Sequence, residues 1–189
     1  WFYQENACNK LKPYLFNIIM KTIEHFVDGK SFSGKSKKNG KVFNPATGEQ
    51  SAVVKLATTE DVNIAVANAQ KAFESWSNKP PLQRARVMFK FKELIEKNSD
   101  ELTKIIVAEH GKVYEDARGS LTRGLEVVEY ACGIPQMLKG EFTENVGSNV
   151  DSWSIRQPLG VCAGITPFNF PAMVPMWMFP MAIACGNTF

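Results

Sequence analysis

One end of this 189-residue sequence lacks charge altogether, because Arg156 is the last charged residue. An uncharged run as long as residues 157–189 is also found in membrane-spanning helices. Prolines recur through this run, however, and each removes a backbone donor that lipid cannot replace. They are Pro158, Pro167, Pro171, Pro175 and Pro180. The sequence therefore favours burial of this stretch against protein over a membrane span.

Residues that bind metals, phosphates or nucleic acids are also scarce. The two histidines and four cysteines include no CxxC pair, so no zinc site of recognisable spacing can be assembled. No GxGxxG is present, and Gly34 with Gly40-Lys41 is spaced one residue too widely for a phosphate loop. Val42 stands where such a loop needs Ser or Thr. A net charge of +3, from 22 basic and 19 acidic residues, predicts no binding to nucleic acid or to a membrane.

The uncharged end instead has the pattern of a strand, a turn and a helix. Residues 160–166 are small or β-branched and lie between prolines, which predicts a strand buried on both faces of a parallel sheet. Residues 167–171 form the turn, and Pro171 suits the first position of an apolar helix over residues 172–184. Ligands bind at the carboxyl ends of strands in open α/β sheets. Asn169 therefore stands where a catalytic group is expected.

Short strands and amphipathic helices are expected ahead of this unit. The Asp28-Gly29 pair predicts a β-hairpin, and two more strands are expected at residues 42–45 and 52–57. Apolar periodicity, caps and breakers predict four helices. They run from Thr58 or Thr59 to the Pro80-Pro81 pair, from that pair to Asn98, from Asn98 to Glu109 with Gly111 as the stop, and from about Val113 to about Leu138.

Three further expectations concern the polar residues of this region. The charged residues of the second helix, Arg84 among them, are expected to face solvent. His110 is expected to make a structural polar contact and not to bind a ligand. Residues 150–157 alternate with period two, which predicts a strand of an exposed sheet. Together these elements predict an α/β protein, the front portion of a doubly wound domain.

Several segments together resemble the aldehyde dehydrogenase superfamily. Within residues 158–189, Pro158-Leu-Gly-Val, Thr166-Pro-Phe-Asn-Phe-Pro171 and Gly186-Asn187 resemble the segment in which a Pro-Trp-Asn-Phe-Pro turn follows the first strand of the NAD-binding domain. Phe168 replaces the commoner Trp of that turn. This replacement points to the CoA-acylating methylmalonate-semialdehyde (malonate-semialdehyde) dehydrogenase branch. Three other segments point the same way: Phe43-Asn-Pro-Ala-Thr-Gly48, Glu109-His-Gly-Lys112 and Arg123-Gly-Leu-Glu-Val-Val-Glu129.

The resemblance covers about residues 20–189 and implies roles for the residues that match. It implies that Asn169 belongs to the oxyanion hole and that Arg123 pairs with the free carboxylate of a semialdehyde substrate. The residues that would border the NAD are Ile165, Thr166, Pro167 and Phe168. The aromatic walls of the substrate tunnel would be Phe170 and Trp177.

The resemblance also implies what the chain needs beyond these residues. The activity would be NAD-dependent oxidation of malonate or methylmalonate semialdehyde, with coenzyme A as co-substrate, as in valine catabolism. The catalytic Cys and the general-base Glu lie beyond Phe189 in the family, so we interpret the sequence as an N-terminal fragment. Cys162 and Cys185 do not match the nucleophile and are expected to be small buried hydrophobes.

The expected organisation has four parts. Residues 1–19 are interpreted as an upstream extension, because they lack the pattern of a signal or transit peptide. Residues 20–139 form strands and helices of the NAD-binding domain, residues 140–157 bridge subunits of a homotetramer, and residues 158–189 begin the dinucleotide-binding sheet. A start at Met20 implies a cytoplasmic enzyme, or a mitochondrial one in a eukaryote. A non-catalytic interaction subunit, another aldehyde dehydrogenase branch and an unrelated nucleotide-binding module stay open as alternatives.

Overall fold

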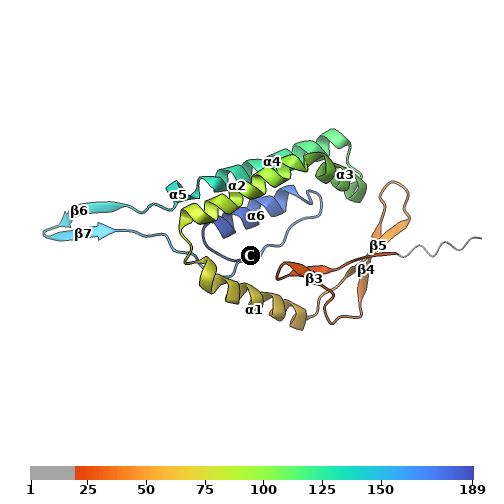
Figure 1. Ribbon diagram of the computed structural model, residues 1–189, viewed down its shortest axis with the longest axis horizontal. Coiled ribbons are helices and arrows are strands. Elements are labelled where there is room, and N and C mark those ends of the chain that lie inside the picture. Colours follow the sequence, from red (N-terminus) through yellow and green to blue (C-terminus); the bar gives the residue numbers. More distant parts are fainter. Residues whose placement is uncertain (1–19) are drawn as a thin grey trace, which may run out of the picture.

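The computed structural model describes residues 20–189 and divides into strands, packed helices and a projecting hairpin (Figure 1). The prediction about residues 1–19 lies outside the described residues. The strands are β1 (Lys21–Ile23), β2 (His25–Val27), β3 (Lys30–Phe32), β4 (Asn39–Phe43), β5 (Gln50–Lys55), β6 (Phe142–Gly147) and β7 (Val150–Trp153). The helices are α1 (Thr59–Trp76), α2 (Pro81–Lys97), α3 (Ser99–His110), α4 (Tyr114–Cys132), α5 (Ile134–Met137) and α6 (Met173–Ala184).

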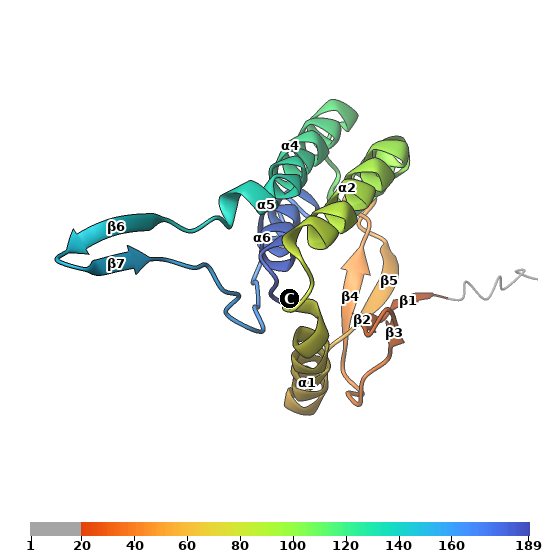
Figure 2. The same cartoon turned by 60° about the vertical axis from the view of Figure 1, so that its left-hand side comes forward.

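The N-terminal strands form two small sheets on one side of the helices, opposite the projecting hairpin (Figure 2). β2 and β3 pair antiparallel across the Asp28-Gly29 turn, whose two residues have φ of 56° and 70°. Positive φ at both positions is what a two-residue hairpin turn requires, so the predicted hairpin is confirmed. In the other sheet β5 lies between β1, which is parallel to it, and β4, which is antiparallel.

α1 begins with a capping box centred on Thr58. The Thr58 hydroxyl accepts a hydrogen bond from the Asp61 N–H at 3.1 Å, and the Asp61 carboxylate accepts one from the Thr58 N–H at 2.8 Å. Asp61 also accepts from the Lys35 N–H at 2.9 Å, which joins the β3–β4 loop to the helix. These donors stabilise the ionised carboxylate and lower the pKa of Asp61, with the bonds from Thr58 contributing most. The predicted N-cap is therefore confirmed.

α2, α4 and α6 pack together as the centre of the molecule. The buried apolar residues form two clusters between these helices, extended by α3 and α5. One cluster consists of Ala85, Met88, Ala131, Cys132, Ile134 and Ala184, and the other of Ile95, Ile106, Ala117, Leu121, Val128 and Met176. Gly124 of α4 allows α6 to approach closely, since a Cβ there would lie 2.4 Å from Cε of Met176 and 3.1 Å from Cα of Met173.

Two predictions in this region need correction: the end of the fourth helix and the polar contact of His110. The fourth helix ends at Cys132 and not near Leu138, because Pro135 has no N–H and cannot continue it; residues 134–137 form the separate α5. α3 ends as predicted at Gly111, in a left-handed conformation with φ of 78°. Nδ1 of His110, however, is buried with no hydrogen-bond partner in residues 20–189, so the polar contact expected of His110 is not made by that nitrogen.

The prediction that Arg84 faces solvent is wrong. Its side chain is only 4% exposed, and Nε donates to the Ala184 carbonyl at 2.8 Å while Nη1 donates to the Lys79 carbonyl. The Ala184 carbonyl lies at the C-terminal end of α6, has no partner inside its helix and carries negative partial charge, so the buried guanidinium satisfies it. Burial lowers the pKa of Arg84.

The strand predicted at residues 160–166 is reduced to one parallel bridge, between Val161 and Thr188. It is bounded by hydrogen bonds from the Cys162 N–H to the Thr188 carbonyl and from the Thr188 N–H to the Gly160 carbonyl, at 2.8 and 3.2 Å. Residues beyond the bridge are exposed, including Ile165 at 96%, so they are not buried on both faces. A strand needs neighbours along its whole length, and here only one residue has a partner. The apolar helix is confirmed, but it begins at Met173 with Ala172 as its N-cap, after Pro171.

β6 and β7 form an antiparallel hairpin that projects from the helices (Figure 1). The expected exposed strand at residues 150–157 is confirmed over its first four residues, while β6 is a strand that the sequence analysis did not specify. Every residue of both strands is exposed, and Phe142 pairs with Trp153 across the hairpin. In the part of the chain that the structure describes, no helix has both the length and the apolar content needed to cross a bilayer.

Candidate active site

The candidate site centres on the turn between the Val161 bridge and α6. Ile165 and Phe168 are 96% and 91% exposed, and Asn169 is also exposed. Within the described chain, the backbone N–H groups of residues 163–166 and of Phe168 and Asn169 donate no hydrogen bond, and Pro167 has none. The turn therefore presents free amides and one side-chain amide at the carboxyl end of the parallel pair, where ligands bind in α/β sheets.

α4 and α6 bring two of the predicted substrate residues together. The Trp177 indole N–H donates to the Arg123 carbonyl at 3.4 Å, although 54 positions separate these residues in sequence. Gly124, next to Arg123, allows the close approach of the two helices. Because Trp177 is 45% exposed, its ring is still accessible beside the helix crossing.

Arg123 itself faces outward and lines a cavity of about 610 Å³ on α4 and the adjoining helix ends. Its neighbours there include Arg118 and the carboxylates of Glu115 and Glu126. Arg118 is bound to Glu115 at 2.6 Å, whereas the Arg123 guanidinium forms no ion pair with residues 20–189. A planar guanidinium without a carboxylate partner can bind an anion through two parallel hydrogen bonds.

Two residues at the site were not assigned a role from the sequence. Lys112, at the end of the Glu-His-Gly-Lys segment, places Nζ 3.7 Å from the centre of the Phe170 ring. Asn187 is only 7% exposed, and its side-chain oxygen accepts from the N–H groups of Leu159 and Gly160 at 2.6 and 3.0 Å. Asn187 thus holds the start of the bridge segment against the end of α6. The resemblance to the family included Lys112 and Gly186-Asn187, but the sequence carried no signal of the contacts that Lys112 and Asn187 make.

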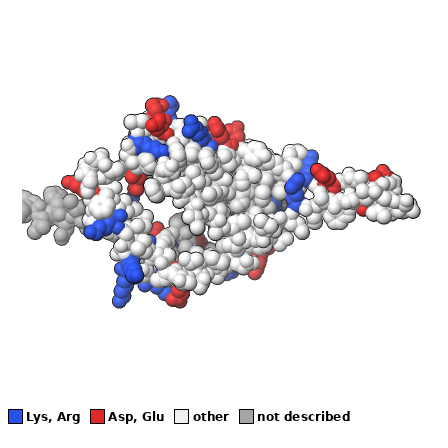
Figure 3. Space-filling view, turned by 180° about the vertical axis from the view of Figure 1, so that it is seen from behind, with Lys and Arg blue, Asp and Glu red and all other residues white. Residues whose placement is uncertain are grey.

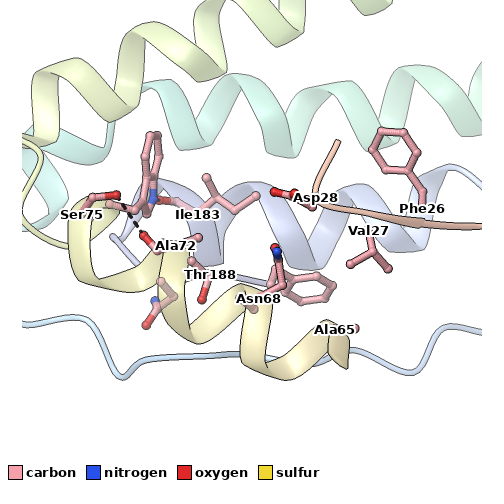
Figure 4. Close-up of a pocket in the computed structure, with 13 residues that line it drawn as sticks. Phe26, Val27, Asp28, Ala65, Asn68, Ala72, Ser75, Ile183 and Thr188 are labelled. Atoms are coloured by element: carbon pink, nitrogen blue, oxygen red, sulfur yellow. Dashed lines mark hydrogen bonds between the residues drawn. The ribbon is translucent and has the colours of Figure 1, made fainter. Parts of the chain in front are cut away.

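A second cavity, of about 440 Å³, lies between the β2–β3 hairpin, α1 and the end of α6 (Figure 4). Its wall includes Phe26, Asn68 and Thr188. At one end the Trp76 indole, which donates to the Ile183 carbonyl at 2.9 Å, joins α1 to α6. None of the predicted site residues lines this cavity, so we place the candidate chemistry at the turn.

The back of the molecule is largely uncharged across its middle, in keeping with the uncharged C-terminal quarter (Figure 3).

The cysteines in the described chain do not have the surroundings of a nucleophile. Cys132 is buried, while Cys162 and Cys185, which were expected to be buried, are only half-buried. Burial raises the pKa of Cys185, and the nearby Arg84 only partly offsets this. A raised pKa reduces the thiolate fraction that a nucleophile needs. Among residues 20–189 no three His, Cys, Asp or Glu side chains group as a metal site.

The fold and the turn define the class of protein. The sequence matches the aldehyde dehydrogenase family over residues 32–189, and the chain belongs to that family. The aldehyde dehydrogenase fold predicted from the sequence is confirmed, because solved members superpose over nearly all of the described chain.

Particular relatives narrow the resemblance to one branch. The malonate-semialdehyde dehydrogenase of Pseudomonas aeruginosa is 52% identical over 170 residues, covering 90% of this chain and 34% of its own length. The mitochondrial, acylating methylmalonate-semialdehyde dehydrogenase of Arabidopsis thaliana is 50% identical, covering 88% and 28%. Among solved structures, the methylmalonate-semialdehyde dehydrogenase of Oceanimonas doudoroffii superposes with a TM-score of 0.86 at 57% identity, covering 89% and 34%. The chain therefore spans about a third of the length of the curated relatives that it matches.

Proposed function

We propose that this chain supplies the oxyanion and substrate-binding part of an NAD-dependent, CoA-acylating malonate or methylmalonate-semialdehyde dehydrogenase. The observation that carries the proposal is the Trp177–Arg123 contact, which joins α4 to α6, the helix that follows the turn bearing Asn169. Below, "complete enzyme" means residues 20–189 continued by the remaining length found in the relatives. For the experiments below, that remaining length is taken from the 52% identical Pseudomonas protein and joined after Phe189.

Asn169 is suited to stabilising the oxyanion that forms when a nucleophile attacks an aldehyde. A side-chain amide can be aimed at the developing charge and does not titrate near neutral pH. Asn169 is exposed at the turn, and the neighbouring backbone amides are free to add a second donor. Removing one such donor typically lowers kcat by roughly 10²–10³. We expect a loss of that size for Asn169→Ala in the complete enzyme.

Arg123 is suited to selecting aldehydes that carry a carboxylate. Its guanidinium has no ion pair with the described residues and shares an open cavity with Arg118 and Glu126. Trp177 and Phe170 would form the apolar walls between this charge and the reacting carbonyl. A semialdehyde acid has its carboxylate and its carbonyl at opposite ends, so in this proposal the Arg123 cation would bind one group and the Asn169 amide the other.

The turn also fits the binding of NAD. Its exposed backbone at residues 165–168 lies at the carboxyl end of the parallel Val161–Thr188 pair, where dinucleotides bind in α/β sheets. A Sinorhizobium meliloti protein that is 50% identical and named as a methylmalonate-semialdehyde dehydrogenase was solved in complex with NAD, with a TM-score of 0.86. NAD, when bound, accepts a hydride from the substrate. The residues of this chain would orient the NAD and exclude water from it.

The projecting hairpin supports assembly into a homo-oligomer, which we propose is a tetramer. Phe142, Val146, Val150 and Trp153 are each at least half exposed on its two strands. Exposed apolar residues on a paired strand with a free edge favour pairing with another chain. Residues 140–157 are accordingly the segment that we assign to contacts between subunits.

The product of the reaction tests this proposal. With NAD, coenzyme A and malonate semialdehyde, the complete enzyme should form NADH and an acyl-CoA in equal amounts, and omitting coenzyme A should slow turnover. Residues 20–189 alone should show no turnover, because the described cysteines are not placed as nucleophiles. Free acid as the main product would assign the chain to another branch of the family. Absence of any aldehyde oxidation by the complete enzyme would favour a non-catalytic interaction subunit.

A further inference from the structure

Lys112 occupies a fixed position between α3 and α4. It follows Gly111, which ends α3 in the left-handed conformation and donates its N–H to the Val107 carbonyl at 2.8 Å. Gly111 also packs against Pro45 of the β4–β5 turn, where an added Cβ would lie 3.1 Å from Cγ of Pro45. The backbone that carries Lys112 is thus held by a helix end on one side and by the N-terminal sheet on the other.

The ammonium group of Lys112 lies against an aromatic ring and not against a carboxylate. Nζ is 3.7 Å from the centre of the Phe170 ring, well inside the distance of about 6 Å at which a cation is attracted to a ring face. The lysines that form ion pairs within residues 20–189 are Lys30, Lys35, Lys90, Lys92 and Lys104, so Lys112 is not one of them. Lys112 is half-buried, which reduces competition from water for the cation.

Phe170 is the point at which the exposed turn meets the body of the protein. Residues 165–169 are exposed, whereas Phe170 is half-buried and its carbonyl accepts from the Val174 N–H of α6 at 3.4 Å. The peptide bond that Phe170 shares with Asn169 therefore joins the exposed part of the turn to a residue held by contacts. Any contact that fixes the Phe170 ring also restricts the direction in which the Asn169 amide points.

We propose that Lys112 is a positioning residue, whose ammonium holds the Phe170 ring and thereby aims the Asn169 amide at the oxyanion. This inference rests on the proposed function of Asn169 in aldehyde oxidation. It gives the last residue of the Glu109-His-Gly-Lys112 segment a role that does not involve touching the substrate. Lys112 acts through Phe170, so it should affect the rate of the chemical step and leave binding of the substrate almost unchanged.

The contact itself can be tested in the present chain without any activity. Protons near the face of an aromatic ring resonate upfield, so the ε-methylene of Lys112 should be shifted upfield in the proton NMR spectrum of residues 20–189. The shift should disappear in Phe170→Leu, while the ε-methylene of the exposed Lys71 should be the same in both proteins. An unshifted Lys112 signal in the wild-type chain would overturn the inference, whatever the activity of the complete enzyme.

The role is tested by kinetics of the complete enzyme with malonate semialdehyde. Lys112→Met keeps the length of the side chain and removes its charge, and it should lower kcat by about 2- to 5-fold, the scale of one cation–ring contact. KM should stay within about twofold, Lys112→Arg should restore kcat, and Lys71→Met should match the wild type. In a Phe170→Leu background, Lys112→Met should have no further effect, because its partner is gone.

Two results would overturn the positioning role. If Lys112→Met raised KM for malonate semialdehyde and not for propanal, Lys112 would bind the substrate carboxylate directly. If Lys112→Arg lost as much kcat as Lys112→Met, a cation over the ring would not be what the enzyme needs. A complete enzyme that oxidised no semialdehyde would contradict the proposed function, while the NMR result would still decide whether Lys112 holds Phe170.

Discussion

Replacing Gly124 by Ala tests whether α6 is held closely against α4 at Gly124, where the two helices cross. The new Cβ would lie 2.4 Å from Cε of Met176, 3.3 Å from Cβ of Met176 and 3.1 Å from Cα of Met173. The Met176 methyl group can swing away, but Met176 is only 5% exposed and belongs to a packed cluster, and the Met173 backbone cannot yield without moving α6. Overpacking of this kind costs about 1–3 kcal/mol, and the gain in helix propensity from Gly to Ala offsets about 0.5–1 kcal/mol. We therefore expect a net loss of about 1–2 kcal/mol in the free energy of unfolding.

Urea denaturation of residues 20–189 measures this loss, provided that the dependence on urea concentration is the same for both proteins. Gly119→Ala is the matched control on the same helix, since its Cβ would meet nothing within 4 Å. It should stabilise the protein by about 0.5–1 kcal/mol through helix propensity alone. If Gly124→Ala stabilised the protein as much as Gly119→Ala, α6 would not be held against α4 at this point.

Three further predictions concern groups that the structure places in unusual surroundings. Arg84→Met should lower the free energy of unfolding by about 1–3 kcal/mol, because the buried Ala184 carbonyl and the Lys79 carbonyl lose their donor. The exposed Arg86→Met should change it by less than about 0.5 kcal/mol, and equal effects in urea titrations would contradict the buried role of Arg84. The pKa of Asp61 is lowered from 3.8, so ionisation of Asp61 stabilises the folded protein fully above pH 3.8. This stabilisation is lost as the pH falls further, through the pKa of the folded state. Asp61→Asn should weaken this dependence of the free energy of unfolding on acid pH, and an unchanged dependence would show that Asp61 is not its source. Because burial raises the pKa of Cys185, its thiol should react with a disulfide reagent at pH 7 more slowly in the folded chain than in urea, and equal rates would refute the shift.

The local structure of the chain could be predicted largely from single residues. Thr58 marks the start of α1 and Gly111 the end of α3, because a cap and a left-handed stop depend only on the neighbouring backbone. The Asp28-Gly29 turn likewise specifies the β2–β3 hairpin by its own conformation. These predictions succeed because the physical cause and the signal lie within a few residues of each other.

The errors arose where a residue depends on distant partners. Arg84 is buried at the end of α6, where Ala184, a hundred positions later, has a carbonyl that accepts from its Nε. Residues 160–166 have the composition of a buried strand, but a strand needs paired neighbours, and only Val161 has one in the described chain. The contact of Lys112 with Phe170 spans 58 positions and leaves no periodic signal in the sequence. Patterns of spacing report on local structure and could not reveal these contacts.

For the candidate site, the family resemblance supplied what composition could not. Arg123 alone has the character of a surface charge, and Trp177 alone that of a core aromatic residue. The structure brings them together at 3.4 Å, through the Trp177 indole and the Arg123 carbonyl. Their roles toward a substrate stay predictions, as does that of Asn169.

The most direct test of the central claim compares two aldehydes in the complete enzyme, one with a carboxylate and one without. If Arg123 binds the carboxylate of malonate semialdehyde, Arg123→Ala leaves the anion half-paired and should cost about 2–5 kcal/mol in kcat/KM, or roughly 30-fold or more. The same variant should leave kcat/KM for propanal almost unchanged, and Arg123→Lys should recover only part of the loss, because a point charge cannot make two parallel hydrogen bonds. Equal losses on malonate semialdehyde and propanal would show that Arg123 holds α4 in place, and that the assignment of a semialdehyde acid as substrate is wrong.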